Sequence, residues 1–342
     1  MATSPFIVDA HLDLAYNALR GRNVLLPARE QTADPEGIPS CGLPDLRAGG
    51  VGLICATIFC APDDPKERGY RNAEEAYDAG TAQLAWYEKQ NAAGEILLVK
   101  DRQALSKAGT DGKLRAIVLL EGADPLRTPA DVKSFVDRGV RIVGLAWRKT
   151  RYAGGTGAPG PLTADGIALV KELDRLGVIH DASHLAEESF WQLMELSPGR
   201  VMASHSNCRH FVPTDRQLSD AMIRAIVERD GVIGINFYDR FLIPPADYGK
   251  RRANLADVCM HIRYMCDLVG DAKHVAIGTD MDGGLGREQI PVEIETSADL
   301  PRIGDALNKA GFDDPAIRGI LGRNWMEFFA GALPKAKYPS ST

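Results

Sequence analysis

The chain has 342 residues, of which 45% are hydrophobic and 25% are charged, and its formal net charge is −6. This composition is typical of a folded globular protein and excludes a disordered chain, while the slight negative charge argues against nucleic acid or an anionic membrane surface as the main partner. No run approaches the roughly 20 consecutive apolar residues that a membrane span requires.

Short apolar runs alternate with helical patterns along the chain, which is typical of parallel strands joined by crossover helices. Most of the runs are continuous rather than alternating, as in strands that are covered on both faces. Eight of them predict strands: Phe6–Asp9, Val51–Ile58, Ala116–Leu120, Arg141–Ala146, Val178–Asp181, Val201–Ser204, Val232–Asn236 and His274–Gly278. A further run, Ile96–Lys100, is interpreted as an accessory strand. The helices predicted between and after them are Asn72–Asn91, Ala130–Asp137, Ala164–Leu176, Ala186–Glu195, Gln217–Asp230, Leu255–Leu268, Pro301–Ala310 and Pro315–Phe329.

Eight strands with intervening helices predict an α/β protein, a (β/α)8 TIM barrel formed as one domain over residues 1–342, with its active site at the C-terminal ends of the strands. The alternative is a doubly wound open sheet. That fold has no positive support here, because neither G-x-G-x-x-G nor G-x-x-x-x-G-K-[ST] occurs. Two long stretches, near residues 21–50 and 148–163, are expected to be loops at the barrel mouth.

The cysteines and the N-terminus indicate the cellular compartment. Six cysteines in 342 residues, without a C-x-x-C pair, favour reduced thiols over a disulfide scaffold. Met1–Pro5 lead directly into an apolar strand, without the basic start and long apolar stretch of a secretory signal. We therefore expect a cytoplasmic protein.

Metal-binding residue types follow several of the predicted strands. They are His11 and Asp13 after the first strand, Glu121 after the third, His184 after the fifth, His205 after the sixth and Asp280 after the eighth. Residues i and i+2 of an extended chain point to the same side, so the first pair can offer a nitrogen and an oxygen to one ion. The glutamate has two oxygens and could bridge two ions about 3.5–4 Å apart. Imidazole and carboxylate are ligands that zinc prefers.

Each of these residues also has a plainer interpretation. The His11-x-Asp13 pair could arise by chance, and Glu121 could simply end a strand. His184 could begin a helix, Asp280 could form a turn before Gly283-Gly284, and His205 could be an ordinary buried histidine. Their common position at strand ends favours the metal site. The other histidines lack that position and are interpreted as structural or exposed: His180, His210, His261 and His274.

Several motifs in this order resemble the membrane dipeptidase family, also called renal dipeptidase or peptidase family M19, among the amidohydrolase-like metal barrels. The resemblance covers nearly the whole chain. The matching segments are Val8–Asp13, Asp45–Gly52, Glu121-Gly122, Asp181–His184, His205–Asn207, Arg216–Asp220, Asn236–Tyr238 and Gly278–Gly283.

The resemblance implies two zinc ions per chain and a small dipeptide-like substrate with a free carboxylate. His11 and Asp13 would bind one ion, and Glu121 would bridge to a second ion bound by His184 and His205. Two further sets of roles are implied. Asp280 would be the catalytic acid/base beside Glu121, and Arg216 would hold the substrate carboxylate with Tyr238 nearby. A homodimer is suggested by the resemblance alone.

One position departs from the family pattern. The dipeptidases commonly carry a histidine just after the fourth strand, which contacts the oxygen of the scissile carbonyl. Here Trp147 lies at or beside that position, and an indole donates only one hydrogen bond and cannot become cationic. Oxyanion stabilisation would then come from zinc, from Arg148 or from elsewhere; alternatively, Trp147 only packs at the barrel top.

The function predicted is that of a metal-dependent hydrolase of the membrane dipeptidase type, with a D-residue at the C-terminal position of the substrate as one option. Two alternatives remain open. One is another metal-dependent amidohydrolase, for example one that acts on N-acyl amino acids. The other is a zinc-retaining binding protein that has lost catalysis.

Overall fold

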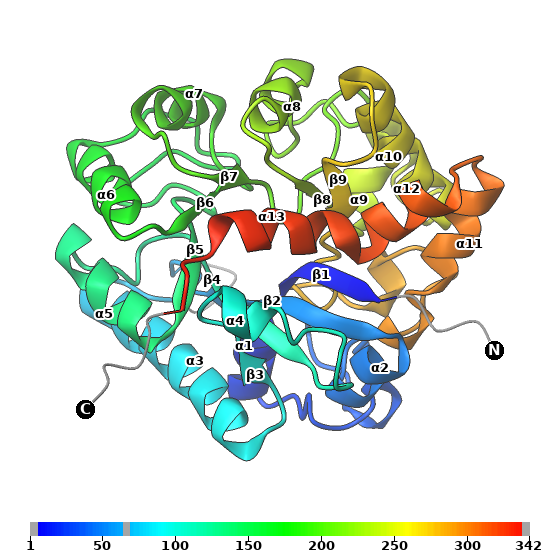
Figure 1. Ribbon diagram of the computed structural model, residues 1–342, viewed down its shortest axis with the longest axis horizontal. Coiled ribbons are helices and arrows are strands. Elements are labelled where there is room, and N and C mark those ends of the chain that lie inside the picture. The colour runs from blue at the N-terminus through cyan, green and yellow to red at the C-terminus, as the bar shows by residue number, and fades with distance from the viewer. Residues whose placement is uncertain (1–5, 64–68, 337–342) are drawn as a thin grey trace.

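The computed structural model describes residues 6–63 and 69–336 and shows strands surrounded by helices (Figure 1). The strands are β1 (Ile7–Leu12), β2 (Val51–Phe59), β3 (Leu97–Leu98), β4 (Arg115–Glu121), β5 (Val140–Gly144), β6 (Ile179–Asp181), β7 (Val201–Met202), β8 (Ile233–Ile235) and β9 (Val275–Ile277). All eight predicted strands are present, and the accessory run forms the short strand β3.

The strands form a parallel sheet that curls into a barrel. Strands β1-β2-β4-β5-β6-β7 are neighbours in that order, β3 pairs with β4, and β8 pairs with β9. The bond from Ala203 N to Val232 O, 3.0 Å long, joins the end of β7 to β8, and the bond from Asp280 N to His11 O, 3.3 Å long, joins the end of β9 to β1. The predicted TIM-barrel fold is therefore confirmed.

The helices surround the sheet and connect successive strands (Figure 1). They are α1 (Leu14–Leu19), α2 (Leu43–Ala48), α3 (Ala73–Ala93), α4 (Arg102–Leu105), α5 (Val132–Arg138), α6 (Ala164–Arg175), α7 (Glu187–Leu196), α8 (Asp220–Val227), α9 (Asp239–Leu242), α10 (Leu255–Val269), α11 (Arg302–Lys309), α12 (Asp314–Arg318) and α13 (Asn324–Ala332). Each helix predicted from the sequence has a counterpart among them.

Three differences from the expected helices have local causes. Helix α8 begins later than predicted because the Ser219 hydroxyl caps its first turn by accepting a bond from Met222 N. The predicted helix Pro315–Phe329 contains a π-helical turn, η6 (Gly319–Arg323), between α12 and α13. Helix α2 lies inside the stretch 21–50 that was expected to be loop, because six residues are too few to show a helical period.

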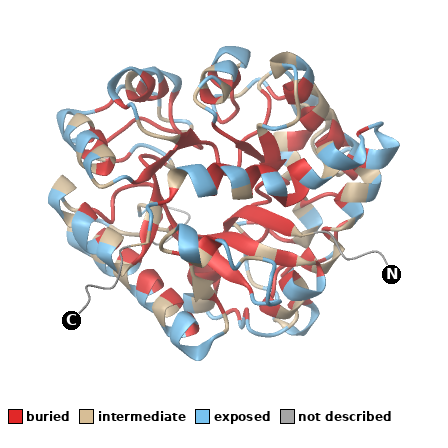
Figure 2. Cartoon of the chain, in the orientation of Figure 1, coloured by how far each residue is buried: buried red, intermediate tan, exposed pale blue. Residues whose placement is uncertain are grey.

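Two apolar cores hold the barrel together. One lies between the sheet and the outer helices, and the other fills the barrel interior with side chains such as Val8, Leu53 and Ile117. Helix α13 crosses the N-terminal end of the strands and adds Trp325 to the inner core, where its Nε1 donates to Ile277 O at 2.8 Å (Figure 1). Figure 2 shows the buried strands inside helices whose outer faces are exposed. The interior is thus packed and closed at one end, and the opposite end carries the strand C-termini.

Across residues 6–63 and 69–336, none of the helices is both long and apolar enough to cross a lipid bilayer. Met1–Pro5, on which the expectation of no secretory signal depends, lie outside the described residues.

Candidate metal centre

The five residues predicted as metal ligands meet at the C-terminal end of the barrel, with Glu121 between them. One carboxylate oxygen, Oε2, lies 3.2 Å from Nε2 of His11. The other oxygen, Oε1, lies 3.1 Å from Nε2 of His184 and 3.5 Å from Nε2 of His205. The two oxygens of one carboxylate therefore face two separate groups of ligand atoms, which is the arrangement that a bridging ligand needs.

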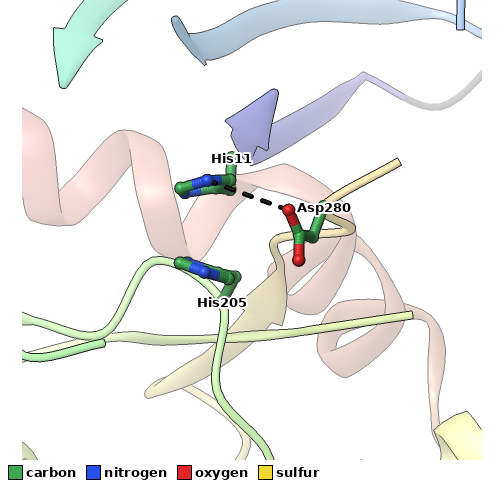
Figure 3. A group of neighbouring side chains, drawn as sticks. All are labelled: His11, His205 and Asp280. Atoms are coloured by element: carbon green, nitrogen blue, oxygen red, sulfur yellow. Dashed lines mark ion pairs between the residues drawn. The ribbon is translucent and has the colours of Figure 1, made fainter. Parts of the chain in front are cut away.

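Asp13 and Asp280 complete the cluster on the His11 side. Oδ2 of Asp13 lies 3.5 Å from Nε2 of His11, and Oδ1 of Asp280 lies 3.9 Å from the same atom. Figure 3 shows Asp280 and the rings of His11 and His205 turned toward one another, and the two ring centroids are 3.7 Å apart. All six side chains are buried.

The unpaired atoms of the cluster fit divalent cations. Within the described chain, Nε2 of His11 and Oδ1 of Asp13 are buried without a hydrogen-bond partner. The Nε2 atoms of His184 and His205 face each other at 3.0 Å, and two lone pairs cannot satisfy each other. Three sets of atoms lie close enough to share one ion: His11 with Asp13 and Glu121, Glu121 with His184 and His205, and His11 with His205 and Asp280. Nitrogen and oxygen donors of these types suit zinc, manganese or cobalt.

The electrostatics of the cluster are those of a strongly anionic pocket. Burial alone would lower the pKa of His11, but the Glu121 and Asp13 carboxylates raise it well above its usual value. Burial raises the pKa of Asp280 to about 8, with the nearby carboxylates adding to the effect and the His11 ring opposing it. Burial, followed by the positive charge of Arg216, lowers the pKa of His184 to about 4. Such an excess of buried negative charge attracts cations.

The backbone holds two of these side chains in an uncommon conformation. His184 and Asp280 have φ angles of 66° and 61°, in the left-handed region that costs a non-glycine residue roughly 1–3 kcal/mol. Asp280 is further fixed by Asn236, whose Nδ2 donates to Oδ2 at 2.9 Å. Oδ1 of Asp280 is thereby left facing the cluster.

A cavity of about 550 Å³ opens over the cluster. Asp13, Glu121, His184 and Asp280 line its floor. Its remaining lining residues are Tyr16, Arg20, Pro35, Glu36, Phe59, Trp147, Arg148, Thr156, Tyr238, Phe241, Gly283, Gly284 and Leu285. The cavity is large enough for a small molecule.

Three of the predicted substrate-binding residues lie in the cavity wall: Tyr238, Trp147 and Arg148. The ring of Trp147 packs edge-on against Phe59 with centroids 5.0 Å apart, and it lies 6.2 Å from the ring of His184. It therefore packs at the barrel top and also faces the cavity, which combines the two interpretations of this residue.

Arg216 lies deeper than expected. Its guanidinium is buried against Phe241, with Nη1 donating to Ser206 Oγ at 3.1 Å and Nη2 to His205 O at 2.6 Å. Its Nε has no partner within the described part of the chain. Arg216 thus supports the backbone of a predicted ligand and keeps further N–H donors.

Sequence reasoning missed several cavity residues, among them Tyr16, Glu36 and Thr156. Tyr16 lies on the short helix α1 directly after Asp13, and its hydroxyl donates to Glu36 Oε1 at 3.0 Å. Glu36 and Thr156 belong to the two stretches that were expected at the barrel mouth, which was the available signal for them.

Comparisons with known proteins agree with this geometry. Residues 1–335 match the sequence pattern of a family described as membrane dipeptidase, peptidase family M19. A Klebsiella pneumoniae protein, described as an uncharacterized protein in the pqqA 5′ region, is 33% identical over 248 residues, which cover 69% of this chain and 89% of that protein.

Two crystal structures are similar over nearly the whole chain. One is the dipeptidase AC, a metallopeptidase of family M19, with a TM-score of 0.83 at 26% identity, covering 97% of this chain and 99% of that chain. The other is a metallopeptidase from Rhodobacter sphaeroides bound to a phosphinate mimic of the dipeptide L-Ala-D-Ala. Its TM-score is 0.82 at 26% identity, and the match covers 97% of this chain and 100% of that chain.

Proposed function

The chain belongs to the membrane dipeptidase family, peptidase family M19, whose members are metal-dependent hydrolases, and from this premise we propose that it is a two-zinc dipeptidase. The observation that carries the proposal is the position of Glu121, whose two oxygens face His11 on one side and His184 and His205 on the other. A pair of divalent ions bound there would supply Lewis-acid activation of the peptide carbonyl and of a water molecule.

Asp280 is proposed as the group that moves the proton. Its Oδ1 faces the cluster while Asn236 holds Oδ2. Its raised pKa allows the side chain to hold a proton near neutral pH. We expect Oδ1 to take a proton from the attacking water and to pass it to the departing amine.

Arg216 is proposed to bind the terminal carboxylate of the substrate. A guanidinium can pair with a carboxylate through two parallel hydrogen bonds, and Arg216 keeps donors beyond its two bonds to the protein. Tyr238, Trp147 and Arg148 line the cavity and would shape the space for the substrate side chains. The L-Ala-D-Ala mimic in the Rhodobacter sphaeroides structure supports a D-residue at the C-terminal position of the substrate.

A substrate panel tests this proposal. Zinc-loaded protein is assayed with L,L- and L,D-dipeptides, with the C-terminal amides of the same dipeptides, and with N-acyl amino acids, lactones and phosphoesters. Turnover of free dipeptides and poor turnover of the amides support the dipeptidase. A preference for N-acyl amino acids would identify another amidohydrolase, and no turnover of any substrate would identify a binding protein.

Two further parts of the proposal concern the cell and the assembly. All six cysteines are free and buried, which is consistent with a reducing cytoplasm. The homodimer implied by the family resemblance is retained as a proposal, and sedimentation analysis of the full chain tests it.

A further inference from the structure

Two hydroxyl groups hold the far side of all three imidazoles of the cluster. Oγ of Ser204 lies 2.6 Å from Nδ1 of His205 and 3.3 Å from Nδ1 of His11. Oγ1 of Thr156 lies 3.0 Å from Nδ1 of His184. One hydroxyl therefore serves a ligand on each side of Glu121, and the other serves one ligand only.

The hydrogen of Ser204 is already engaged. Its Oγ donates to Oδ2 of Asp181 at 2.6 Å, whereas its contact with Ser183 Oγ is longer, at 3.4 Å. Asp181 is fixed in turn, because its Oδ1 accepts the backbone N–H groups of Ser183 at 3.0 Å and Ser204 at 2.9 Å. Ser204 and Asp181 are fully or almost fully buried, so water does not compete for these bonds.

A hydroxyl has one hydrogen and two lone pairs. Because the hydrogen of Ser204 goes to Asp181, only lone pairs remain for the two imidazoles, and Nδ1 of both His11 and His205 must be the donor. A neutral imidazole with its hydrogen on Nδ1 has its lone pair on Nε2. In both rings Nε2 is the atom that faces Glu121.

We propose that Ser204, held by Asp181, is a positioning residue that fixes the tautomer of one histidine ligand at each of the two ion sites. Thr156, which comes from the stretch 148–163 at the barrel mouth, orients only His184. This inference rests on the proposed two-metal function and adds to it that one hydroxyl couples both sites. Groups that orient metal ligands typically change metal affinity by 10–100-fold when they are removed.

A matched pair of variants tests the inference, since Ser204→Ala and Thr156→Ala each remove one hydroxyl. The probe is Zn²⁺ alone, titrated against a competing chelator to give the dissociation constants of both sites. Ser204→Ala should weaken both sites by roughly 10–100-fold, and Thr156→Ala should weaken one site only. Thr156→Ser, which keeps the hydroxyl, should restore that site.

A second readout reports the hydrogen bonds themselves. In zinc-loaded protein labelled with ¹⁵N-histidine, the Nδ1–H protons of His11 and His205 should exchange slowly with water, unlike those of the exposed His210. Both should lose protection in Ser204→Ala, and only His184 should lose it in Thr156→Ala. If Ser204→Ala does not fold, the wild-type spectrum decides, because exchange of the two protons as fast as in His210 overturns the inference.

The outcomes separate this inference from the proposed function. If the wild-type chain binds no zinc, the proposed function fails and the inference with it. If the wild-type chain binds two ions and Ser204→Ala binds both as tightly, only the inference fails.

Discussion

Replacing Gly283 by alanine should disable hydrolysis while the fold and the metal content stay nearly intact. A Cβ at this position would lie 2.0 Å from Oδ1 of Asp280 and 3.0 Å from Oδ2 of Asp13. Ordinary contact begins at 3.4 Å, so the Asp280 carboxylate must retreat by about 1.4 Å. Because a misplacement of about 1 Å can reduce rates by ~100-fold, we expect kcat to fall at least that much, or about 2.7 kcal/mol in activation free energy.

The assay compares kcat, KM, zinc content and melting temperature of Gly283→Ala with those of the wild type. Gly177→Ala is the control, because Gly177 has a φ of 66° and no neighbour within 4 Å of an added Cβ. The control should lose about 1 kcal/mol of stability through backbone strain and keep its kcat. A Gly283→Ala enzyme with kcat within a few-fold of wild type, and with Asp280 unmoved in its crystal structure, would refute the reasoning.

Three more predictions follow from the same contacts. Glu121→Gln removes the bridging charge while keeping the shape, so elemental analysis should find fewer than two ions per chain and hydrolysis should be lost; full metal content with full activity would contradict this. Arg216→Lys should raise KM for free dipeptides by roughly 10–100-fold, through loss of a charge-assisted pair, and should change KM little for their C-terminal amides; equal effects on both substrates would assign Arg216 a purely structural role. Burial lowers the pKa of His261 to about 4, below its unfolded value of about 6.5, so the folded state resists protonation and stability is lost as the pH falls from about 6.5 to 4. Denaturant titrations should show His261→Gln losing about 3 kcal/mol less than wild type over that range, and parallel pH curves would contradict the assignment.

The parts of the fold that the sequence predicted are those with a strong apolar pattern. Strands buried on both faces are continuous apolar runs, so all eight were found, and β4 ends at Glu121 as expected. Strand β7 is shorter than predicted because Ser204 leaves the ladder to bond Asp181 with its backbone N–H and its hydroxyl. That bond depends on a residue 23 positions away, so no local pattern shows it.

The candidate site shows the same division. His11, Glu121 and His205 follow recognisable strands, so their positions could be predicted from the order of elements. The left-handed backbone of His184 and the deep burial of Arg216 depend on packing between distant segments, which residue spacing does not reveal. The contribution of Tyr16 was missed because α1 is too short to leave a helical period in the sequence.

The most direct test of the two-metal proposal is a crystal structure of the active, metal-loaded protein, with anomalous scattering recorded at the zinc edge. We predict two peaks flanking the Glu121 carboxylate, one beside His11 and Asp13 and the other beside His184 and His205. A single peak, or peaks away from Glu121, in protein that hydrolyses dipeptides at full rate would contradict it.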